Sequence, residues 1–348
     1  MSPYITTLLL LTLGLGTTIT FASSHWLLAW MGLEINTLAI IPLMSKHHHP
    51  RAVEATTKYF LTQATAAATL LFASTTNAWL TGHWDIHLMT HPIPTTMIAL
   101  ALALKIGLAP LHTWLPEVLQ GLDLMTGLIL STWQKLAPLI LILQVPLQDQ
   151  KLIPALALLS TLVGGWGGLN QTQLRKILAY SSIAHLGWMM IVIQFSPQLT
   201  LLALSMYLIM TTATFLLLAK NKTTTINELA TSWTKTPTLT VVTPALLLSL
   251  GGLPPLAGFM PKWLILQELT KQDLPALATL TALSALLSLF FYLRLCYSMT
   301  LTMSPNNTSN SPIWRTSPHP TTFLLPLTTI LTALLLPTTP IFTAIMQL

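Results

Sequence analysis

The sequence contains very little charge and almost no cysteine. Of its 348 residues only 7% are charged, and Cys296 is the single cysteine. A soluble domain carries about 25% charged residues, so a soluble globular fold is excluded. One cysteine excludes an internal disulfide and a cysteine-based metal site. The sequence also lacks a P-loop and a glycine-rich dinucleotide motif, so we expect no bound nucleotide. Its basic residues lie mostly between apolar runs, so we expect no nucleic-acid partner.

Long apolar runs dominate what remains, because 53% of the residues are hydrophobic. The runs are ~20 residues long and do not alternate, which favours transmembrane helices over a barrel. We therefore expect an all-α polytopic membrane protein with about eleven spans. The N-terminal run is interpreted as the first span and not as a removed signal or transit peptide. The expected limits are 3–22, 25–44, 59–80, 95–120, 124–145, 152–172, 177–195, 200–219, 238–268, 275–296 and 321–343.

The basic residues fall almost entirely on one side of this topology. If the spans alternate in direction, ten lysines and arginines share the side of the N-terminus, and only Lys151 and Lys271 lie opposite. The positive-inside rule then places the N-terminus on the cytoplasmic or matrix side and the C-terminus on the other. The ten residues are Lys46, Arg51, Lys58, Arg175, Lys176, Lys220, Lys222, Lys235, Arg294 and Arg315.

Two of the expected spans share a broken-helix pattern with a nearby lysine. The fourth contains "LKIGLAPLHTWLPE" and the ninth contains "LGGLPPLAGFMPKW". They lie five spans apart, so the two copies would be inverted, which indicates a transporter-type site. We predict one membrane domain, 1–348, with repeats at 1–145 and 150–300 and a C-terminal helix at 321–343. The predicted breaks lie at Gly107 and Pro110 in the first copy and at Gly251, Gly252, Pro254, Pro255 and Gly258 in the second.

Away from the span ends, four charged residues lie inside expected spans: Glu34, Lys105, Lys135 and Lys262. Each opposes membrane insertion by ~2.5–3.5 kcal/mol, so each needs a partner or water. One interpretation is a set of structural ion pairs or snorkelling side chains. The other is a proton or ion relay, because a desolvated lysine near a carboxylate can switch its proton when a neighbouring charge moves.

Two histidines are further candidates. His112 follows the first predicted break, and His185 lies in the middle of the seventh expected span. Histidine titrates near neutral pH, so either residue could pass protons. Hydrogen bonding within the helix bundle is the alternative explanation for both.

Four segments resemble one known family. "APLHTWLPE" with its upstream lysine, "WQKLAP", "LAYSSIAHLGW" and "GLPPLAGFMPKW" are similar to the antiporter-like membrane subunits of respiratory complex I. The resemblance implies two inverted five-helix repeats, each with one discontinuous helix, plus a C-terminal helix. It implies a subunit of proton-translocating NADH:ubiquinone reductase in the inner mitochondrial membrane, with the N-terminus on the matrix side and the C-terminus on the intermembrane-space side. NADH, FMN, iron–sulfur clusters and ubiquinone would bind elsewhere in the complex, leaving no cofactor or metal on this chain.

The same resemblance implies roles for individual residues. Glu34 and Lys105 match a glutamate–lysine pair, and Lys135 matches a central lysine that links two half-channels. Lys262 matches the lysine of the second broken helix, while His112 and His185 match polar positions along a hydrated axis. The implied partners are other membrane-arm subunits, including the other antiporter-like ones, and the lipid bilayer, with cardiolipin at the lipid edge.

Two other functions stay open at this point. A free-standing cation/proton antiporter would need a dedicated ion site, yet Glu34 is the only carboxylate expected at mid-membrane. A passive scaffold would brace its neighbours and move no proton. Ion exchange by the purified chain would favour the antiporter, whereas unaltered pumping after Lys135→Met or Lys105→Met would favour the scaffold.

Overall fold

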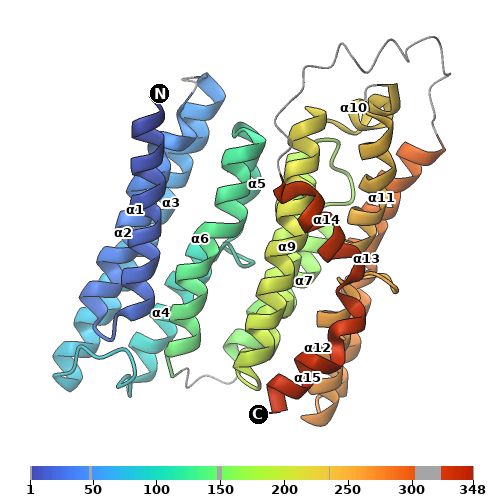
Figure 1. Cartoon of the computed structure of the whole chain (residues 1–348). Helices are drawn as coiled ribbons and strands as arrows, with labels where there is room; N and C mark the ends of the chain where they lie inside the picture. Colours follow the sequence, from blue (N-terminus) through green and yellow to red (C-terminus); the bar gives the residue numbers. More distant parts are fainter. Residues whose placement is uncertain (1, 47–48, 147–150, 235, 302–322, 348) are drawn as a thin grey trace. The chain divides into compact units, whose positions relative to one another are not determined.

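The chain is an all-helical polytopic membrane protein. The computed structural model describes residues 2–46, 49–146, 151–234, 236–301 and 323–347, so Lys235 and Arg315 of the basic set lie outside the described residues. Within the described ranges the only extended pairing is two isolated bridges. The helices (Figure 1) are α1 (Pro3–Ala22), α2 (Trp26–Met44), α3 (Pro50–Thr81), α4 (Pro92–Ile106), α5 (Trp114–Gly121), α6 (Leu124–Gln144), α7 (Leu152–Gly167), α8 (Leu174–Val192), α9 (Pro197–Asn221), α10 (Ile226–Ala230), α11 (Pro237–Gly251), α12 (Phe259–Lys271), α13 (Pro275–Thr300), α14 (Leu324–Leu334) and α15 (Thr339–Gln347).

Proline sets where many of these helices begin. The helices α1, α3, α4, α9, α11 and α13 each start at a proline. Proline suits this position because its fixed φ is already helical and the first amides of a helix have no intrahelical partner. The chain is rich in proline, but at these six positions proline begins a helix and does not break one.

Serine and threonine hydroxyls donate hydrogen bonds to backbone carbonyls of their own helices. Thr20 Oγ1 donates to the Thr17 carbonyl at 2.7 Å, and Thr281 Oγ1 donates to the Ala278 carbonyl at 2.9 Å. This bonding to a carbonyl one turn earlier satisfies the hydroxyl without a partner on another helix. Such residues can therefore lie inside an apolar helix without exposing an unpaired donor.

Five of the described helices are long and apolar enough to cross a membrane, namely α1, α2, α6, α9 and α13. The helices α4, α7 and α11 are apolar but shorter. A further pair, α14 and the start of α15, is bent by 62° where a single helix over 321–343 was expected. Pro337 and Pro340 explain the bend, because neither can donate the amide bond that would continue the helix. The total of about eleven spans stays a prediction.

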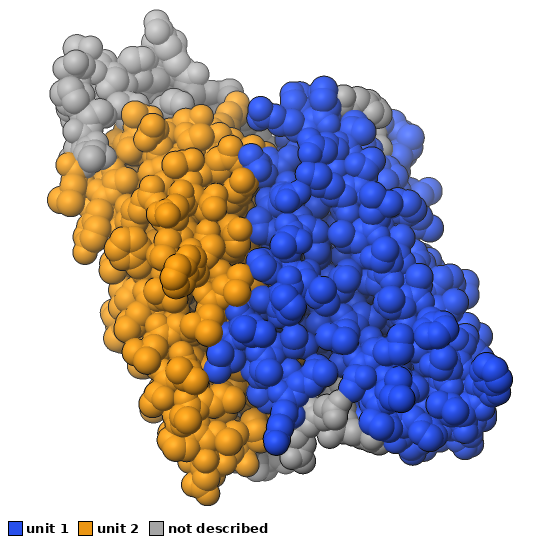
Figure 2. Space-filling view, turned by 180° about the vertical axis from the view of Figure 1, so that it is seen from behind, with its two compact units in different colours: residues 1–160 blue, residues 161–348 orange. Residues whose placement is uncertain are grey.

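The chain divides into two compact units, residues 1–160 and residues 161–348, which Figure 2 colours separately. In unit 1, α2 packs against α1, α3 and α6, while α3 also contacts α4 and α5. In unit 2, α9 contacts α8, α11, α12 and α14, and α13 contacts α8, α10, α11 and α12. In each unit a Gly/Pro segment separates two consecutive helices: residues 107–113 lie between α4 and α5 in unit 1, and residues 252–258 lie between α11 and α12 in unit 2.

Candidate functional site

The gap between α4 and α5 lies at the first Gly/Pro segment. Gly107 ends α4 with φ +86°, a left-handed conformation that suits glycine because it has no Cβ. The amides of Gly107 and Leu108 both donate to the Ala103 carbonyl at 2.9 Å. The Ala109–Pro110 peptide bond is cis, and Pro110 is exposed.

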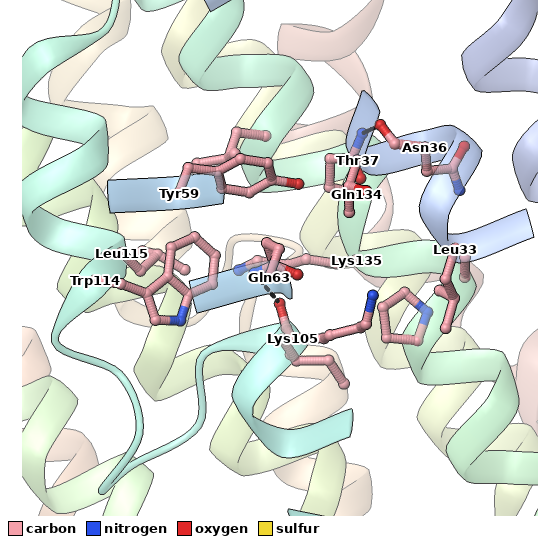
Figure 3. A pocket seen from close by; sticks show the side chains of 14 residues that line it. Leu33, Asn36, Thr37, Tyr59, Gln63, Lys105, Trp114, Leu115, Gln134 and Lys135 are labelled. Carbon is pink, nitrogen blue, oxygen red and sulfur yellow. Dashed lines mark hydrogen bonds between the residues drawn. The ribbon is translucent and has the colours of Figure 1, made fainter. Parts of the chain in front are cut away.

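Two side chains from outside α4 bind its last carbonyls. Trp114 Nε1, in the first turn of α5, donates to the Leu104 carbonyl at 3.1 Å. Gln63 Nε2, on α3, donates to the Lys105 carbonyl at 3.4 Å (Figure 3). These bonds satisfy carbonyls that the break would otherwise leave without partners in an apolar environment.

Lys105 and Lys135 reach one buried cavity from α4 and α6 (Figure 3). Their side chains are only 5% and 2% exposed. The cavity volume is about 20 Å³, which exceeds the roughly 10–15 Å³ that one water molecule needs. Among the residues that the structure describes, Lys105 Nζ has no hydrogen-bond partner. Because a buried ammonium is unfavourable without a partner, the site is suited to water or to exchange of the lysine proton.

Polar side chains line the rest of this cavity. Tyr59 and Gln63 project from α3, and Gln134 projects from α6 (Figure 3). The Tyr59 ring meets the Trp114 ring edge-on, with centroids 5.8 Å apart. Pro138 also lines the cavity and lies within α6, where it supplies no N–H to the Gln134 carbonyl. The wall thus combines hydroxyl, amide and carbonyl groups that can bind water.

Glu34 lies on α2 beside this cavity and not in its wall. Three neighbours on α2, Leu33, Asn36 and Thr37, line the cavity, whereas Glu34 is half-buried on an adjacent face. Its Oε2 accepts a hydrogen bond from Thr37 Oγ1 at 3.1 Å. Within the described part of the chain no ion pair of 4.0 Å or less joins Glu34 to Lys105. The pairing of these two residues stays a prediction.

His112 occupies the gap between α4 and α5. It is half-buried, and its Nδ1 lies 3.3 Å from the Pro110 carbonyl oxygen. The residues that line the Lys105–Lys135 cavity do not include His112. The structure therefore places His112 near the break but separate from the two lysines.

In unit 2, Lys262 closes the second break with its own side chain. Its Nζ donates a 2.7 Å hydrogen bond to the carbonyl of Gly251, the last residue of α11. Gly252 follows with φ +76°, and a Cβ at that position would lie 2.8 Å from Lys262 Cδ. Glycine therefore suits the backbone conformation, and a side chain at this position would displace the lysine. The Pro254–Pro255 bond is cis, and Gly258 precedes α12.

Lys262 and His185 line a second small cavity. The Lys262 side chain is 9% exposed and lies 6.0 Å from the centroid of the Trp188 ring. His185 enters the cavity from α8, and its ring centroid is 5.6 Å from that of Tyr207. Tyr292 and Ser288 enter from α13. The structure thus brings together Lys105 with Lys135 in unit 1 and Lys262 with His185 in unit 2.

Several polar residues of these walls are not among the candidates predicted from the sequence. Tyr59 and Gln63 are four residues apart on α3, and Ser288 and Tyr292 are four apart on α13. Residues four apart share one face of a helix. Paired polar positions at this spacing inside apolar spans are the signal that would have identified them. Within the described residues no three His, Cys, Asp or Glu side chains are placed to hold a metal ion.

Comparison with known proteins identifies the class. A family profile described as "NADH:quinone oxidoreductase/Mrp antiporter, TM" matches residues 23–288. A chain of respiratory complex I from Thermus thermophilus, solved with bound aureothin, is 26% identical and has a TM-score of 0.85, covering 100% of this chain and 80% of that one. A chain of an archaeal membrane-bound sulfane sulfur reductase, at 18% identity, shares the fold with a TM-score of 0.84 over 97% of this chain and 73% of that one. The chain is an antiporter-like membrane subunit.

Further matches narrow this class. A second profile, "NADH dehydrogenase subunit 2 C-terminus", matches residues 289–343. NADH-ubiquinone oxidoreductase chain 2 of Tetraodon nigroviridis is 75% identical over 316 residues, 91% of each chain. The Oncorhynchus mykiss protein of the same name is 68% identical over 332 residues, 95% of each chain. The chain belongs to the family of NADH-ubiquinone oxidoreductase chain 2, and it is therefore a subunit of respiratory complex I. The family expected from the sequence is confirmed.

Proposed function

We propose that this chain translocates protons across the inner mitochondrial membrane, coupled to NADH-to-ubiquinone electron transfer in other subunits of complex I. The observation that carries the proposal is the shared cavity of Lys105 and Lys135, whose volume of about 20 Å³ admits water. Charge on one lysine disfavours charge on the other at short range. A proton that arrives at one of them therefore promotes release from its neighbour.

Each candidate residue has a place in this relay. Glu34 adjusts the charge of Lys105 from outside the cavity, and His112 carries protons through the gap. Lys135 passes the proton onward, and Lys262 with His185 forms a second station. The interruptions that admit water to the two stations are Gly107 and Pro110 in the first half, and Pro254, Pro255 and Gly258 in the second.

The proposal includes a topology and a set of neighbours. The two halves are inverted repeats, the N-terminus faces the matrix and the C-terminus faces the intermembrane space. The basic residues on the N-terminal side support this orientation. The neighbours are the other antiporter-like subunits of the membrane arm, and cardiolipin binds at the lipid edge, where its phosphates complement basic side chains.

The test compares Lys135→Met and Lys105→Met with Lys151→Met in the assembled complex. Lys151 is exposed at the start of α7, so its loss removes a positive charge without touching either cavity. Proteoliposomes report the protons moved per NADH oxidised, and the amount of intact complex reports assembly. We expect the two cavity variants to assemble and to move fewer protons, while Lys151→Met behaves as the wild type.

Two results would overturn the proposal. Cavity variants that pump as the wild type would leave a scaffold role. Vigorous sodium/proton exchange by the chain reconstituted without the rest of the complex, and lost in Lys135→Met, would indicate an independent antiporter.

A further inference from the structure

The Lys262 cavity is built from polar groups on three helices. Ser181 and His185 lie four residues apart on α8, Lys262 lies on α12, and Ser288 and Tyr292 lie four residues apart on α13. The cavity volume is about 10 Å³. A single water molecule needs roughly 10–15 Å³, so this space matches one water molecule and nothing larger.

The Tyr292 hydroxyl is the group in this cavity that lacks a protein partner. Tyr292 is 1% exposed, and its hydroxyl makes no hydrogen bond of normal geometry to any residue that the structure describes. It nevertheless lies against Ser181 on α8. Buried polar groups are almost always hydrogen-bonded to protein or to ordered water. The hydroxyl therefore identifies a water position.

The neighbouring groups have the complementary hydrogen-bonding capacity. Ser181 Oγ donates its proton to the Leu178 carbonyl at 2.7 Å, and Ser288 Oγ donates to the Ala285 carbonyl at 2.8 Å. Both serines line the cavity, and each oxygen keeps lone pairs that can accept a hydrogen bond. Lys262 uses one N–H on the Gly251 carbonyl, which leaves two of its three donors.

We propose that Tyr292 is a further positioning residue of this site, and that its hydroxyl holds one water molecule between Lys262 and His185. The water accepts hydrogen bonds from Lys262 and Tyr292, donates one to His185 and donates the other to a serine oxygen. A buried water typically makes two to four hydrogen bonds. The inference rests on the proposed proton relay and adds the group that completes its second station.

The proton step through this water is balanced. An N–H bond of the Lys262 ammonium breaks as that proton joins the water oxygen. In the same step an O–H bond of the water breaks as its proton joins the His185 imidazole, so the water is unchanged. Tyr292 keeps its own proton throughout, because a phenol ionises only near pH 10 even in water.

A comparison with Tyr207 explains why Tyr292 is chosen. Tyr207 is equally buried and lies beside His185, with ring centroids 5.6 Å apart. Its hydroxyl lies against Ser182, whose own proton goes to the Ala179 carbonyl at 2.7 Å. Among the described residues the Tyr292 hydroxyl is left without a hydrogen bond of normal geometry, whereas the Tyr207 hydroxyl is not.

The test uses Tyr292→Phe in the intact complex, with Tyr297→Phe as its control. Both residues lie on α13, but Tyr297 is 56% exposed and outside the cavity. Phenylalanine retains the ring that packs against Phe291 at 4.4 Å between centroids, so only the hydroxyl is removed. We expect NADH oxidation coupled to pumping to slow by about tenfold in Tyr292→Phe. The solvent deuterium isotope effect should rise, because the proton step becomes rate-limiting, and Tyr297→Phe should change neither.

Lys262→Met separates failure of this inference from failure of the proposed function. If Lys262→Met loses pumping while Tyr292→Phe keeps the wild-type rate and isotope effect, the role of Tyr292 is excluded and the relay stands. If Lys262→Met itself pumps normally, the second station is excluded altogether. Should Tyr292→Phe not assemble, Ser181→Ala and Ser288→Ala receive the same measurements, and a wild-type rate and isotope effect in both overturn the proposal.

Discussion

Lys262 donates a hydrogen bond to the carbonyl of Gly251, eleven residues earlier and on the other side of a helix break. In unit 1, Lys105 lies before the break, in the last turn of α4; its carbonyl is bound by Gln63 and its ammonium has no partner in the described residues. One break is therefore closed by the lysine itself and the other by neighbouring side chains. This difference leads to distinct predictions for the two halves.

Gly252→Ala should destabilise the protein and displace Lys262. The new Cβ would lie 2.8 Å from Lys262 Cδ, at a residue whose φ is +76°. The left-handed conformation alone costs about 1–3 kcal/mol for a residue other than glycine. Gly82→Ala is the matched control, because Gly82 has the same φ of +76° with nothing within 4 Å of its Cβ position. We expect a larger fall in thermal midpoint for Gly252→Ala, and a loss of pumping that Gly82→Ala does not share.

Trp114→Phe should loosen the first break. It removes the N–H that binds the Leu104 carbonyl at 3.1 Å and leaves that carbonyl unpaired. An unpaired buried polar group costs about 1–3 kcal/mol. Hydrogen exchange should accelerate at the Gly107 and Leu108 amides, whose bonds to Ala103 lie in the same turn. Trp79→Phe, at a position 90% exposed, should leave the exchange unchanged; equal acceleration in both variants would contradict the capping role.

Lys105→Met should raise stability while it lowers pumping. A buried ammonium without a partner is unfavourable, and an apolar side chain of similar length removes that cost. Lys262→Met should gain less, because it also removes the donor to the Gly251 carbonyl. Thermal midpoints of the purified variant complexes measure this order. A Lys105→Met complex less stable than Lys262→Met would show that Lys105 is held by interactions other than those described.

Glu117→Gln should leave stability and pumping nearly unchanged. Glu117 Oε2 lies 2.7 Å from Lys58 Nζ and joins α5 to α3, but the two side chains are 53% and 42% exposed. Lys58 also retains Glu54 at 2.8 Å. Solvent-exposed ion pairs contribute little because water and salt screen them. A large fall in the thermal midpoint, measured at low and at high salt, would show that the pair is needed to orient α5.

Composition and periodicity predicted much of this fold. Apolar runs of ~20 residues indicated helices, and the two helix gaps lie at the Gly/Pro segments that the sequence singled out. The bend between α14 and α15 was missed, although Pro337 and Pro340 were visible in the sequence. A proline can begin, bend or end a helix, and local sequence does not distinguish these outcomes.

Side-chain placement within the sites was harder to predict. Leu33, Asn36 and Thr37 share one face of α2 and line the cavity, whereas Glu34 is one residue from Leu33 and about 100° around the helix. The sequence shows that a charge in this span is unusual. It does not show which face of α2 meets the cavity, because four other helices form the rest of the wall. Tyr292 was missed for a different reason: its ring fits an apolar span, and only the packing around its hydroxyl reveals a polar function.

The hydroxyl groups that bond back to their own helices have a consequence for proton leakage. A proton moves along hydroxyls only if each can release its hydrogen bond and accept another. Thr20, Thr214 and Thr281 each donate a hydrogen bond to a backbone carbonyl one turn away. Breaking that bond would leave the hydroxyl and the carbonyl unpaired in an apolar interior, which is unfavourable. The threonines that give these helices their polar composition are thus poor proton conductors. We expect them to prevent a short circuit of the membrane potential around the lysine cavities.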